Sequence, residues 1–416
     1  MSDEQAKAAK IRVLVLFGAI PLLGQERANI RVINAVRESG IHARFLTRQR
    51  FGDEAIEPEL DRLGLEWRKV PFGPNLRRMG LADLWRLFTG IFITNFKVWR
   101  QVREYRPTHL YVMNPLYVFY TMPYVFLNRL PLIYRIGDAP TQHNFMWRTL
   151  WRWITRRITM LVPNADFVKR KCLESGVPEQ KMRHVYSAAP QSFSDAVADG
   201  TDEARLQVSR YENANDGGET RTEIIVRRES DALTILYCGQ IREHKGVGVL
   251  VNCALKLIVE GKQLRVLLAG DYSWNNEFAK ELIEKVKIAG HSKSIQFLGY
   301  VHNAEQLWRV ADIHVCPSCW EEPLANCVLE AKMAGVPSIV FPNGGLPETI
   351  DHQQNGWLCE EASESALETA VRHYLGQRDD LRSHGAEAKK SADGKFGQAT
   401  FVKNWTQVFT DTLRAG

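Results

Sequence analysis

The sequence predicts an α/β protein made of two doubly wound, Rossmann-like domains. Short apolar runs typical of buried parallel strands alternate with amphipathic helical segments in both halves of the chain. The 416 residues suffice for two domains of ordinary size, and 45% hydrophobic with 25% charged residues is an ordinary composition for a globular protein. Glycine-rich and charged motifs follow several expected strands, where ligands bind in such sheets.

The first half opens with a β-loop-α-β unit. Residues 11–17 (IRVLVLF) form its first expected strand, residues 26–39 its helix and residues 41–46 its second strand. Residues 51–106 are expected to form helices rich in Arg, Trp and Phe. The remaining expected strands are 109–113, 132–136, 160–162 and 184–186, and the remaining helices are 116–127, 145–158 and 165–175. The run 107–128 is uncharged but contains three prolines, so it is not expected to span a membrane.

The second half repeats the alternation after a polar stretch. Residues 191–232 are rich in Asp, Glu, Gly and Asn and are expected to connect the domains, with an insertion near 213–220. Domains are therefore expected at 1–190 and 233–395, followed by a terminal segment at 396–416. The expected strands are 233–238, 264–269, 295–298, 314–316 and 337–341, and the helices are 247–260, 278–289, 304–311, 329–334 and 403–413.

Charge is distributed unevenly along the chain. Residues 1–190 hold 30 Lys and Arg against 16 Asp and Glu, a net charge of +14, and the remainder holds 24 against 32, a net charge of −8. The basic half favours an anionic partner, but it carries no nucleic-acid motif, so nucleic acid is not expected.

The seven cysteines lack disulfide or metal spacing. Their pattern and the absence of a signal peptide favour a cytoplasmic location.

The most informative stretch runs from Pro317 to Glu348 and reads PSCWEEPLANCVLEAKMAGVPSIVFPNGGLPE. It holds two carboxylates, Glu322 and Glu330, on either side of an expected helix start. Helix N-terminal amides attract phosphate, and carboxylates accept hydrogen bonds from sugar hydroxyls. The stretch therefore suits a ligand that carries both groups, while an ordinary helix–strand pair with surface glutamates is the alternative.

A second motif follows the strand expected at 233–238. Residues 239–246 (GQIREHKG) form a glycine-bounded loop before a helix, and the loop contains Arg242 and Lys245. Two cations and helix amides can bind two phosphates. Lys245 also fits the cap of a surface helix, and Arg242 could equally point to solvent.

The segment WEEPLANCVLEAKMAGVP at 320–337 and the later GGLPE resemble the retaining glycosyltransferases of family 4, whose C-terminal domain carries E-x7-E in a similar segment. The resemblance implies the GT-B architecture, in which two Rossmann-like domains face one cleft and a helix, here within 396–416, crosses back to the first domain. It implies a nucleotide diphosphate sugar as donor, a carbohydrate or lipid-linked acceptor, and no metal or other cofactor.

The same resemblance assigns roles to residues. Glu322 would hold the hydroxyls of the transferred sugar, and Glu330 would hold those of the ribose. The backbone amides of Leu324 and Ala325 would orient the donor. Lys245 would stabilise the charge on the leaving phosphate.

Three other positions match the family pattern only in part. Gln240 stands where the family has an arginine in G-R-x4-K-G, so Arg242 is the expected substitute. Gly24 matches one glycine of the family's opening loop, and it also fits an ordinary turn. Gly137-Asp138 replaces the usual His-Asp, and Asp138 fits either a contact to the sugar or the cap of a loop.

The helix expected at 145–158 (FMWRTLWRWITRRI) carries Arg148, Arg152 and Arg156 on one face and tryptophans and aliphatic residues on another. One hypothesis is a helix on the inner surface of a membrane, with the arginines facing anionic headgroups. The alternative is an amphipathic helix that packs on its own sheet.

The sequence favours a metal-independent hexosyltransferase of cell-envelope polysaccharide or glycolipid synthesis. A nucleotide-sugar epimerase or hydrolase of the same fold would need acid–base groups, for which Asp138 and His143 are the local candidates. A non-catalytic nucleotide-sugar-binding protein would explain Gln240 and Gly137.

Overall fold

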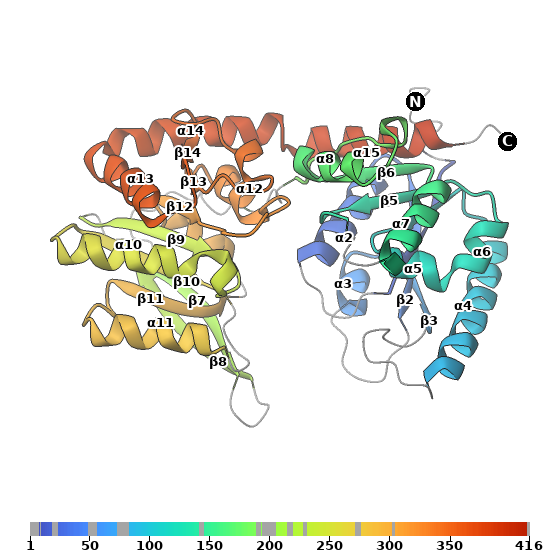
Figure 1. The fold of residues 1–416 in the computed structure, drawn as a ribbon, viewed down its shortest axis with the longest axis horizontal. Helices are drawn as coiled ribbons and strands as arrows, with labels where there is room; N and C mark the ends of the chain where they lie inside the picture. The colour runs from blue at the N-terminus through green and yellow to red at the C-terminus, as the bar shows by residue number, and fades with distance from the viewer. Residues whose placement is uncertain are drawn as a thin grey trace. The chain divides into compact units, whose positions relative to one another are not determined.

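The computed structural model divides into two compact units, which are drawn in Figure 1. Unit 1 contains residues 1–187 and 399–416, and unit 2 contains residues 188–398. Each unit has its own sheet. The residues outside the described part of the chain are 1–7, 9, 19–23, 49–55, 73–82, 141–144, 189–192, 194–204, 214–218, 228–230, 271–275, 302–303 and 414–416.

Unit 1 is built on six parallel strands in the order β3-β2-β1-β4-β5-β6. The strands are β1 (Arg12–Phe17), β2 (His42–Arg48), β3 (Glu66–Val70), β4 (His109–Val112), β5 (Leu132–Ile136) and β6 (Met160–Pro163). The helices are α2 (Gly24–Arg37), α3 (Glu57–Arg62), α4 (Asp83–Tyr105), α5 (Pro115–Tyr120), α6 (Met122–Leu127), α7 (Phe145–Arg157), α8 (Asp166–Glu174) and α15 (Gln398–Thr412). The chain starts at the centre of the sheet and reverses direction after β3, which is the doubly wound pattern.

Helix α15 packs on unit 1 although it follows unit 2 in the sequence. Trp405 and Phe409 are fully buried, and their rings lie 5.9 and 6.3 Å from the ring of Tyr111 in β4. The hydroxyl of Thr412 lies 3.2 Å from Nε2 of His109. These contacts remove a large apolar area from water, so the last helix is part of the unit 1 core.

Unit 2 contains six parallel strands in the order β14-β13-β12-β9-β10-β11. The strands are β9 (Leu233–Cys238), β10 (Leu264–Ala269), β11 (Ile295–Val301), β12 (Ile313–Cys316), β13 (Ser338–Val340) and β14 (Gly356–Leu358). The helices are α10 (Val247–Val259), α11 (Glu277–Ile288), α12 (Asn326–Met333), α13 (Glu364–Gly376) and α14 (Arg378–Gly394). The predicted fold class, with two Rossmann-like sheets, is confirmed.

The prediction for residues 191–232 was wrong in its central part. Residues expected to connect the domains form β7 (Arg205–Asn213) and β8 (Glu219–Arg227), an antiparallel hairpin. The hairpin extends the unit 2 sheet because β7 pairs antiparallel with β11. An edge hairpin needs only backbone pairing with its neighbour, so its sequence can stay polar and lack the apolar run that marks a central strand. Most of the predicted insertion near 213–220 lies outside the described residues.

Three smaller predictions were also wrong. Residues 51–106 were expected to form helices, but strand β3 lies within them and pairs with β2. Residues 184–186 form no strand, and the nearby pairing is an isolated bridge between Leu161 and Met182. The helix expected at 116–127 is split into α5 and α6, because Pro123 lacks the N–H that would continue the helical hydrogen bonds. Within the described residues, no helix has both the length and the apolar character needed to cross a bilayer.

The core contacts of α15 generate a stability prediction. Replacing Trp405 with alanine is expected to lower the free energy of unfolding of unit 1 by about 3–5 kcal/mol, because a fully buried indole leaves a cavity. The exposed Lys403 on the same helix is the matched control, and Lys403→Ala should change stability by less than about 0.5 kcal/mol. Urea denaturation monitored by circular dichroism measures both, and equal effects would contradict the packing of α15.

Candidate functional site

The candidate site of unit 2 lies where the strand order reverses. The chain runs from β9 to β10 and β11 on one side, and then to β12, β13 and β14 on the other side of β9. Strands β9 and β12 are parallel neighbours, so the loops that follow them leave the same edge of the sheet. Open α/β sheets bind ligands in the crevice between two such loops.

The loop after β9 is pressed against the loop after β12, backbone to backbone. Gly246 has a left-handed φ of 71°, and a Cβ atom there would lie 1.7 Å from the carbonyl oxygen of Pro317. The amide of Cys319 donates to the carbonyl of His244 at 3.0 Å. Glycine at 246 is therefore required both by its conformation and by the approach of the second loop.

This packing brings Lys245 and Glu322 together. Nζ of Lys245 donates to Oε2 of Glu322 at 2.5 Å, and the two side chains are 24% and 17% exposed. The hydroxyl of Ser318 lies 3.4 Å from the same carboxylate oxygen. The two sequence motifs thus meet in a partly buried ion pair that solvent or a ligand can still reach.

A third loop, after β13, fixes the backbone of Glu322. The amide of Gly345 donates to the carbonyl of Glu322 at 2.7 Å. Gly344 has a φ of 64°, and a Cβ atom there would lie 2.3 Å from that same carbonyl oxygen. The side-chain amide of Asn343 donates to the carbonyl of Ser318 at 2.8 Å. The NGG turn of the sequence therefore positions the carboxylate.

Helix α12 begins directly after the loop that follows β12. Leu324 and Ala325 are buried, and Ala325 caps the helix without a side-chain hydrogen bond, so the first-turn amides keep donor capacity. Glu330 is half-buried, one turn further along the helix. Burial, then the neighbouring Cys327 and Glu330, raise the pKa of the Cys238 thiol, which puts Glu330 near the end of β9.

Two residues that were expected to bind the donor lie at the surface. The side chains of Gln240 and Arg242 are exposed, and the backbone carbonyl of Gln240 accepts the hydroxyl of Tyr237 at 2.8 Å. Exposure leaves Arg242 able to reach a ligand, but the structure gives it no fixed orientation toward Lys245. The described residues contain no group of three His, Cys, Asp or Glu residues able to hold a metal ion.

Two expected residues belong to unit 1. Gly24 is the first residue of α2, and Asp138 is exposed beyond the end of β5. A Cβ atom on Gly137 would lie 3.5 Å from the side-chain amide of Gln25, so these two stretches of unit 1 are neighbours. His143 lies outside the described residues.

The sequence analysis missed the buried Arg135 in the apolar strand β5. Its guanidinium donates to the hydroxyl of Ser187 at 3.0 Å. Burial lowers the pKa of Arg135, and the nearby Tyr111 and Asp138 oppose that shift. A single arginine inside the run LIYRI was the available signal. It gives unit 1 a buried positive charge close to Gly137.

Comparison with protein families gives two matches. Residues 24–187 match the model described as "Glycosyl transferase 4-like domain", and residues 232–377 match the model described as "Glycosyl transferases group 1". The two matches fall in units 1 and 2 respectively.

Curated relatives include N-acetyl-alpha-D-glucosaminyl L-malate synthase of Bacillus anthracis, 27% identical over 43% of this chain and 46% of that protein. D-inositol 3-phosphate glycosyltransferase of Corynebacterium kroppenstedtii is 25% identical over 63% of this chain and 57% of that protein. The chain spans about half the length of the curated relatives that it matches.

Solved structures share the fold over nearly the whole chain. A glycosyltransferase from Rickettsia africae has a TM-score of 0.78 at 16% identity, covering 98% of this chain and 100% of its own. Anabaena Alr3699/HepE, solved in complex with UDP, has a TM-score of 0.73 at 16% identity and covers 96% of this chain and 100% of its own. At this level of identity the likeness shows that the chain has the GT-B fold of these neighbours, and it shows the fold alone.

The close approach of two loops at Gly246 generates one prediction. Gly246→Ala is expected to cost about 3 kcal/mol or more, because the backbone of Pro317 has to move. Gly261 is a matched control, since its φ is +82° and a Cβ atom there would have nothing within 4 Å, so Gly261→Ala should cost only about 1 kcal/mol. Chemical denaturation compares the two, and equal costs would contradict the loop contact.

Lys332 on α12 generates a prediction about pH. Its side chain is fully buried, its Nζ has no hydrogen-bond partner among the described residues, and burial lowers its pKa from 10.5 to about 8. Between these values the unfolded chain binds more protons than the folded chain, so this residue makes stability rise with pH across that window.

Lys332→Met should therefore stabilise unit 2 at pH 7 by about 2–3 kcal/mol, and this gain should shrink as the pH approaches 10. The measurement is the difference between wild-type and variant unfolding free energies at pH 7, 8.5 and 10. Buried thiols such as Cys253, with a raised pKa of about 12, titrate alike in both proteins and cancel. A constant difference would contradict the prediction.

Proposed function

The chain belongs to the group 1 glycosyltransferases, of the family 4 type, and we propose that it transfers a hexose-type sugar from a nucleotide diphosphate sugar to an acceptor hydroxyl with retention of configuration. The observation that carries the proposal is the Lys245–Glu322 pair, held at the crevice of the unit 2 sheet where the loops after β9 and β13 contact the loop after β12 through Gly246 and Gly344. The pair offers a cation and a hydrogen-bond acceptor side by side, which matches the junction between a diphosphate and a sugar.

The leaving group defines what the site has to supply. When the bond between the anomeric carbon and the β-phosphate oxygen breaks, negative charge grows on that phosphate. Lys245 faces this charge, the first-turn amides of α12 add positive potential, and the exposed Arg242 can turn toward it in place of the neutral Gln240. These groups would stabilise the charge without a metal ion.

The carboxylates have separate roles in this proposal. Glu322 accepts hydrogen bonds from hydroxyls of the transferred sugar, and Glu330, further along α12, accepts those of the ribose. The amides of Leu324 and Ala325 orient the donor between them. In unit 1, Gly24 would allow a close approach of backbone to the donor, and Asp138 would contact the sugar.

The reaction needs no dedicated protein base. The acceptor hydroxyl approaches the anomeric carbon on the face that the diphosphate leaves, its proton passes to the departing phosphate oxygen, and the new glycosidic bond forms on that same face. Retention follows from this geometry. Exclusion of water from the site limits hydrolysis of the donor.

The identity of the nucleotide in the donor can be tested directly. One structural neighbour was solved with UDP and with UDP-glucose, so a UDP-sugar is the first donor to examine. The basic charge of residues 1–190 and the exposed aromatic residues of α4 favour an acceptor of the cell envelope, either polysaccharide or lipid-linked.

A thermal-shift comparison of UDP, GDP, ADP and dTDP tests the donor site. One nucleotide should raise the melting temperature, since a ligand present at 100 times its Kd stabilises by about 2.7 kcal/mol. Lys245→Ala should weaken binding by about 10–100-fold, through loss of a charge-assisted hydrogen bond, and Glu330→Ala by about 10-fold. The exposed Lys262→Ala and Glu284→Ala are charge-matched controls and should bind as wild type does.

Two outcomes would contradict the proposal. If no nucleotide stabilises the protein, the donor site is wrong. If a nucleotide binds but its diphosphate is never released from the sugar in the presence of envelope extract, the protein binds nucleotide sugars without transferring them, and Gln240 becomes the suspected cause.

A further inference from the structure

Helix α4 of unit 1 carries a row of aromatic side chains that face away from the body of the unit. These residues are 41–76% exposed, and they follow one another at intervals of three or four positions, which puts them on one face of the helix. We call this row the aromatic ridge; it consists of Trp85, Phe88, Phe92, Phe96 and Trp99.

The opposite face of α4 is fixed to the unit. Thr94 and Val98 are fully buried. The side chain of Asn95 donates to the carbonyl of Tyr120 and accepts from the amide of Tyr124, both at 2.9 Å, and so ties α4 to α5 and α6. The ridge cannot rotate inward without breaking these contacts, so it is a fixed exposed surface.

The apolar surface continues from α4 over α6 to α7. Figure 1 shows α4 and α6 side by side at the edge of unit 1, and the two helices are in contact. Phe126 and Leu127 of α6 are exposed, and the ring of Phe126 lies 5.2 Å from that of the exposed Trp153 in α7. Phe145, at the start of α7, is 77% exposed. Exposed apolar side chains are therefore present on α6 and α7 as well as on the neighbouring α4.

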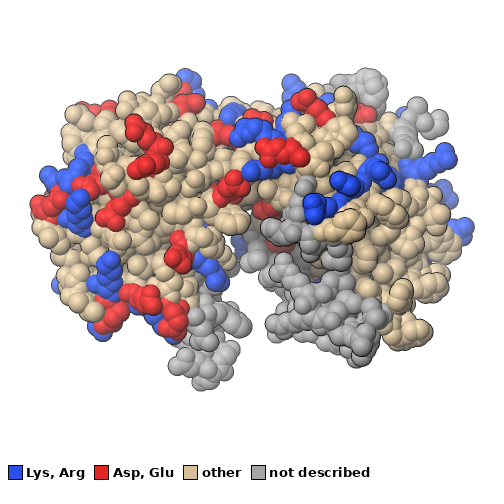
Figure 2. All heavy atoms as spheres, viewed as in Figure 1, with Lys and Arg blue, Asp and Glu red and all other residues tan. Residues whose placement is uncertain are grey.

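The segment that carries this surface is basic. Residues 84–165 contain eleven Lys and Arg, of which Arg135 is buried in β5, and two acidic residues, Glu104 and Asp138. Glu104 already pairs with Arg44 at 2.9 Å. In the view of Figure 2, the surface over α6 and α4 is largely uncharged, and Lys and Arg side chains gather above it. A broad apolar face with a cationic border complements an anionic membrane surface.

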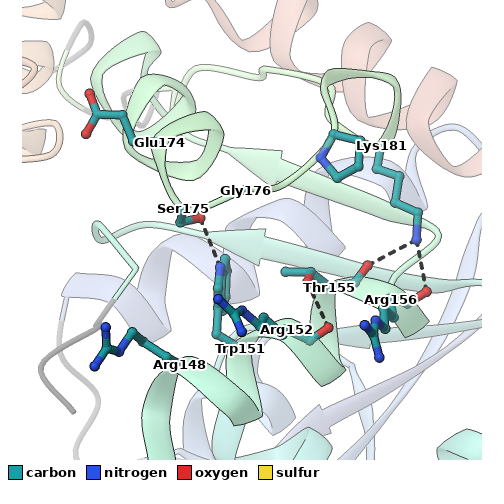
Figure 3. Close-up of a pocket in the computed structure, with 10 residues that line it drawn as sticks. Arg148, Trp151, Arg152, Thr155, Arg156, Glu174, Ser175, Gly176 and Lys181 are labelled. Atoms are coloured by element: carbon teal, nitrogen blue, oxygen red, sulfur yellow. Dashed lines mark hydrogen bonds between the residues drawn. The ribbon is translucent and has the colours of Figure 1, made fainter. Parts of the chain in front are cut away.

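The exposed arginines of α7 add to the positive charge of this part of unit 1. Arg148, Arg152 and Arg156 extend from successive turns and, together with Lys181 and one acidic residue, Glu174, line a cavity of about 600 Å³, shown in Figure 3. Lys181 is held by the carbonyls of Thr155 and Arg156 at 3.0 and 2.9 Å. The arginines are thus presented at a structured, partly concave surface, where guanidinium groups can bind a phosphate through two hydrogen bonds.

The membrane hypothesis drawn from the sequence is changed by these contacts. It assigned the interfacial tryptophans to the helix at 145–158, but Trp151, Ile154 and Ile158 are buried in unit 1, and the indole of Trp151 donates to the hydroxyl of Ser175 at 2.9 Å. The apolar face of α7 therefore packs on its own domain. The exposed apolar surface lies mainly on α4 instead.

We propose that the aromatic ridge and its extension on α6 and α7 dock on a bilayer that contains anionic phospholipid, with Arg148, Arg152 and Arg156 binding headgroup phosphates. Aromatic side chains favour the interface between headgroups and acyl chains. The strong excess of cations selects an anionic surface over a neutral one. This inference is independent of the sugar chemistry, because it concerns none of the donor-site residues.

Vesicle co-sedimentation of the full chain tests the proposal. At low salt, the protein should bind vesicles of phosphatidylcholine with 40% phosphatidylglycerol at least about 10-fold more tightly than pure phosphatidylcholine, and 0.5 M salt should weaken this binding because it screens charge. Binding should also shift the tryptophan emission to the blue as indoles leave water.

Three variants separate the contributions. The ridge variant F88Q/F92Q/F96Q should bind at least about 10-fold more weakly to anionic vesicles and still respond to nucleotide as the wild type does. The arginine variant R148Q/R152Q/R156Q should lose most of the preference for anionic lipid. The control V259Q/I288Q replaces two exposed aliphatic residues of unit 2 and should bind as the wild type does.

Two results would overturn the proposal. The first is wild-type protein that ignores anionic vesicles at low salt. The second is a ridge variant that binds them as the wild type does while remaining folded by circular dichroism. If the wild type instead forms a dimer that the ridge variant cannot form, and neither binds vesicles, the surface is an interface between two copies of this chain.

Discussion

Close backbone contact between loops is the constraint on which the candidate site depends. At Gly246 and Gly344 a Cβ atom would meet a neighbouring carbonyl oxygen, and the same is true at Gly270, where it would lie 1.6 Å from the carbonyl oxygen of Gly239. Such contacts are possible only where side chains are absent. These glycines allow the loops after β9, β10, β12 and β13 to pack closely at one edge of the sheet. The packing brings Lys245 within hydrogen-bond reach of Glu322.

Much of this could be predicted from the sequence. The central strands read as apolar runs because they are covered on both faces, and β9 and β10 have the predicted bounds. The two motifs of unit 2 could be assigned to loops that follow strands. Their meeting could not be derived from spacing alone, since Lys245 and Glu322 are 77 positions apart and only the strand order makes β9 and β12 neighbours.

The features that sequence reasoning missed share one physical cause. The hairpin of β7 and β8 is held by backbone pairing, which leaves little trace in composition. The orientation of α4 depends partly on Asn95, whose side chain makes two hydrogen bonds to the neighbouring helices α5 and α6. Arg135 lies inside an apolar strand, and its burial, which the residue type alone does not reveal, makes it a buried positive charge. Asn95 and Arg135 have partners in other elements of unit 1, and the hairpin joins the sheet through β11, which is distant in the sequence.

The return of α15 to unit 1 has a consequence for the order in which the protein can be made. Unit 1 consists of two segments separated by the whole of unit 2, so a ribosome that has finished residue 187 has not yet made the helix that covers β4. At roughly 5–20 residues per second, the intervening 188–398 take about 10–40 s to synthesise. During that interval the nascent first unit exposes the apolar surface around Tyr111, and it is then most in need of a chaperone.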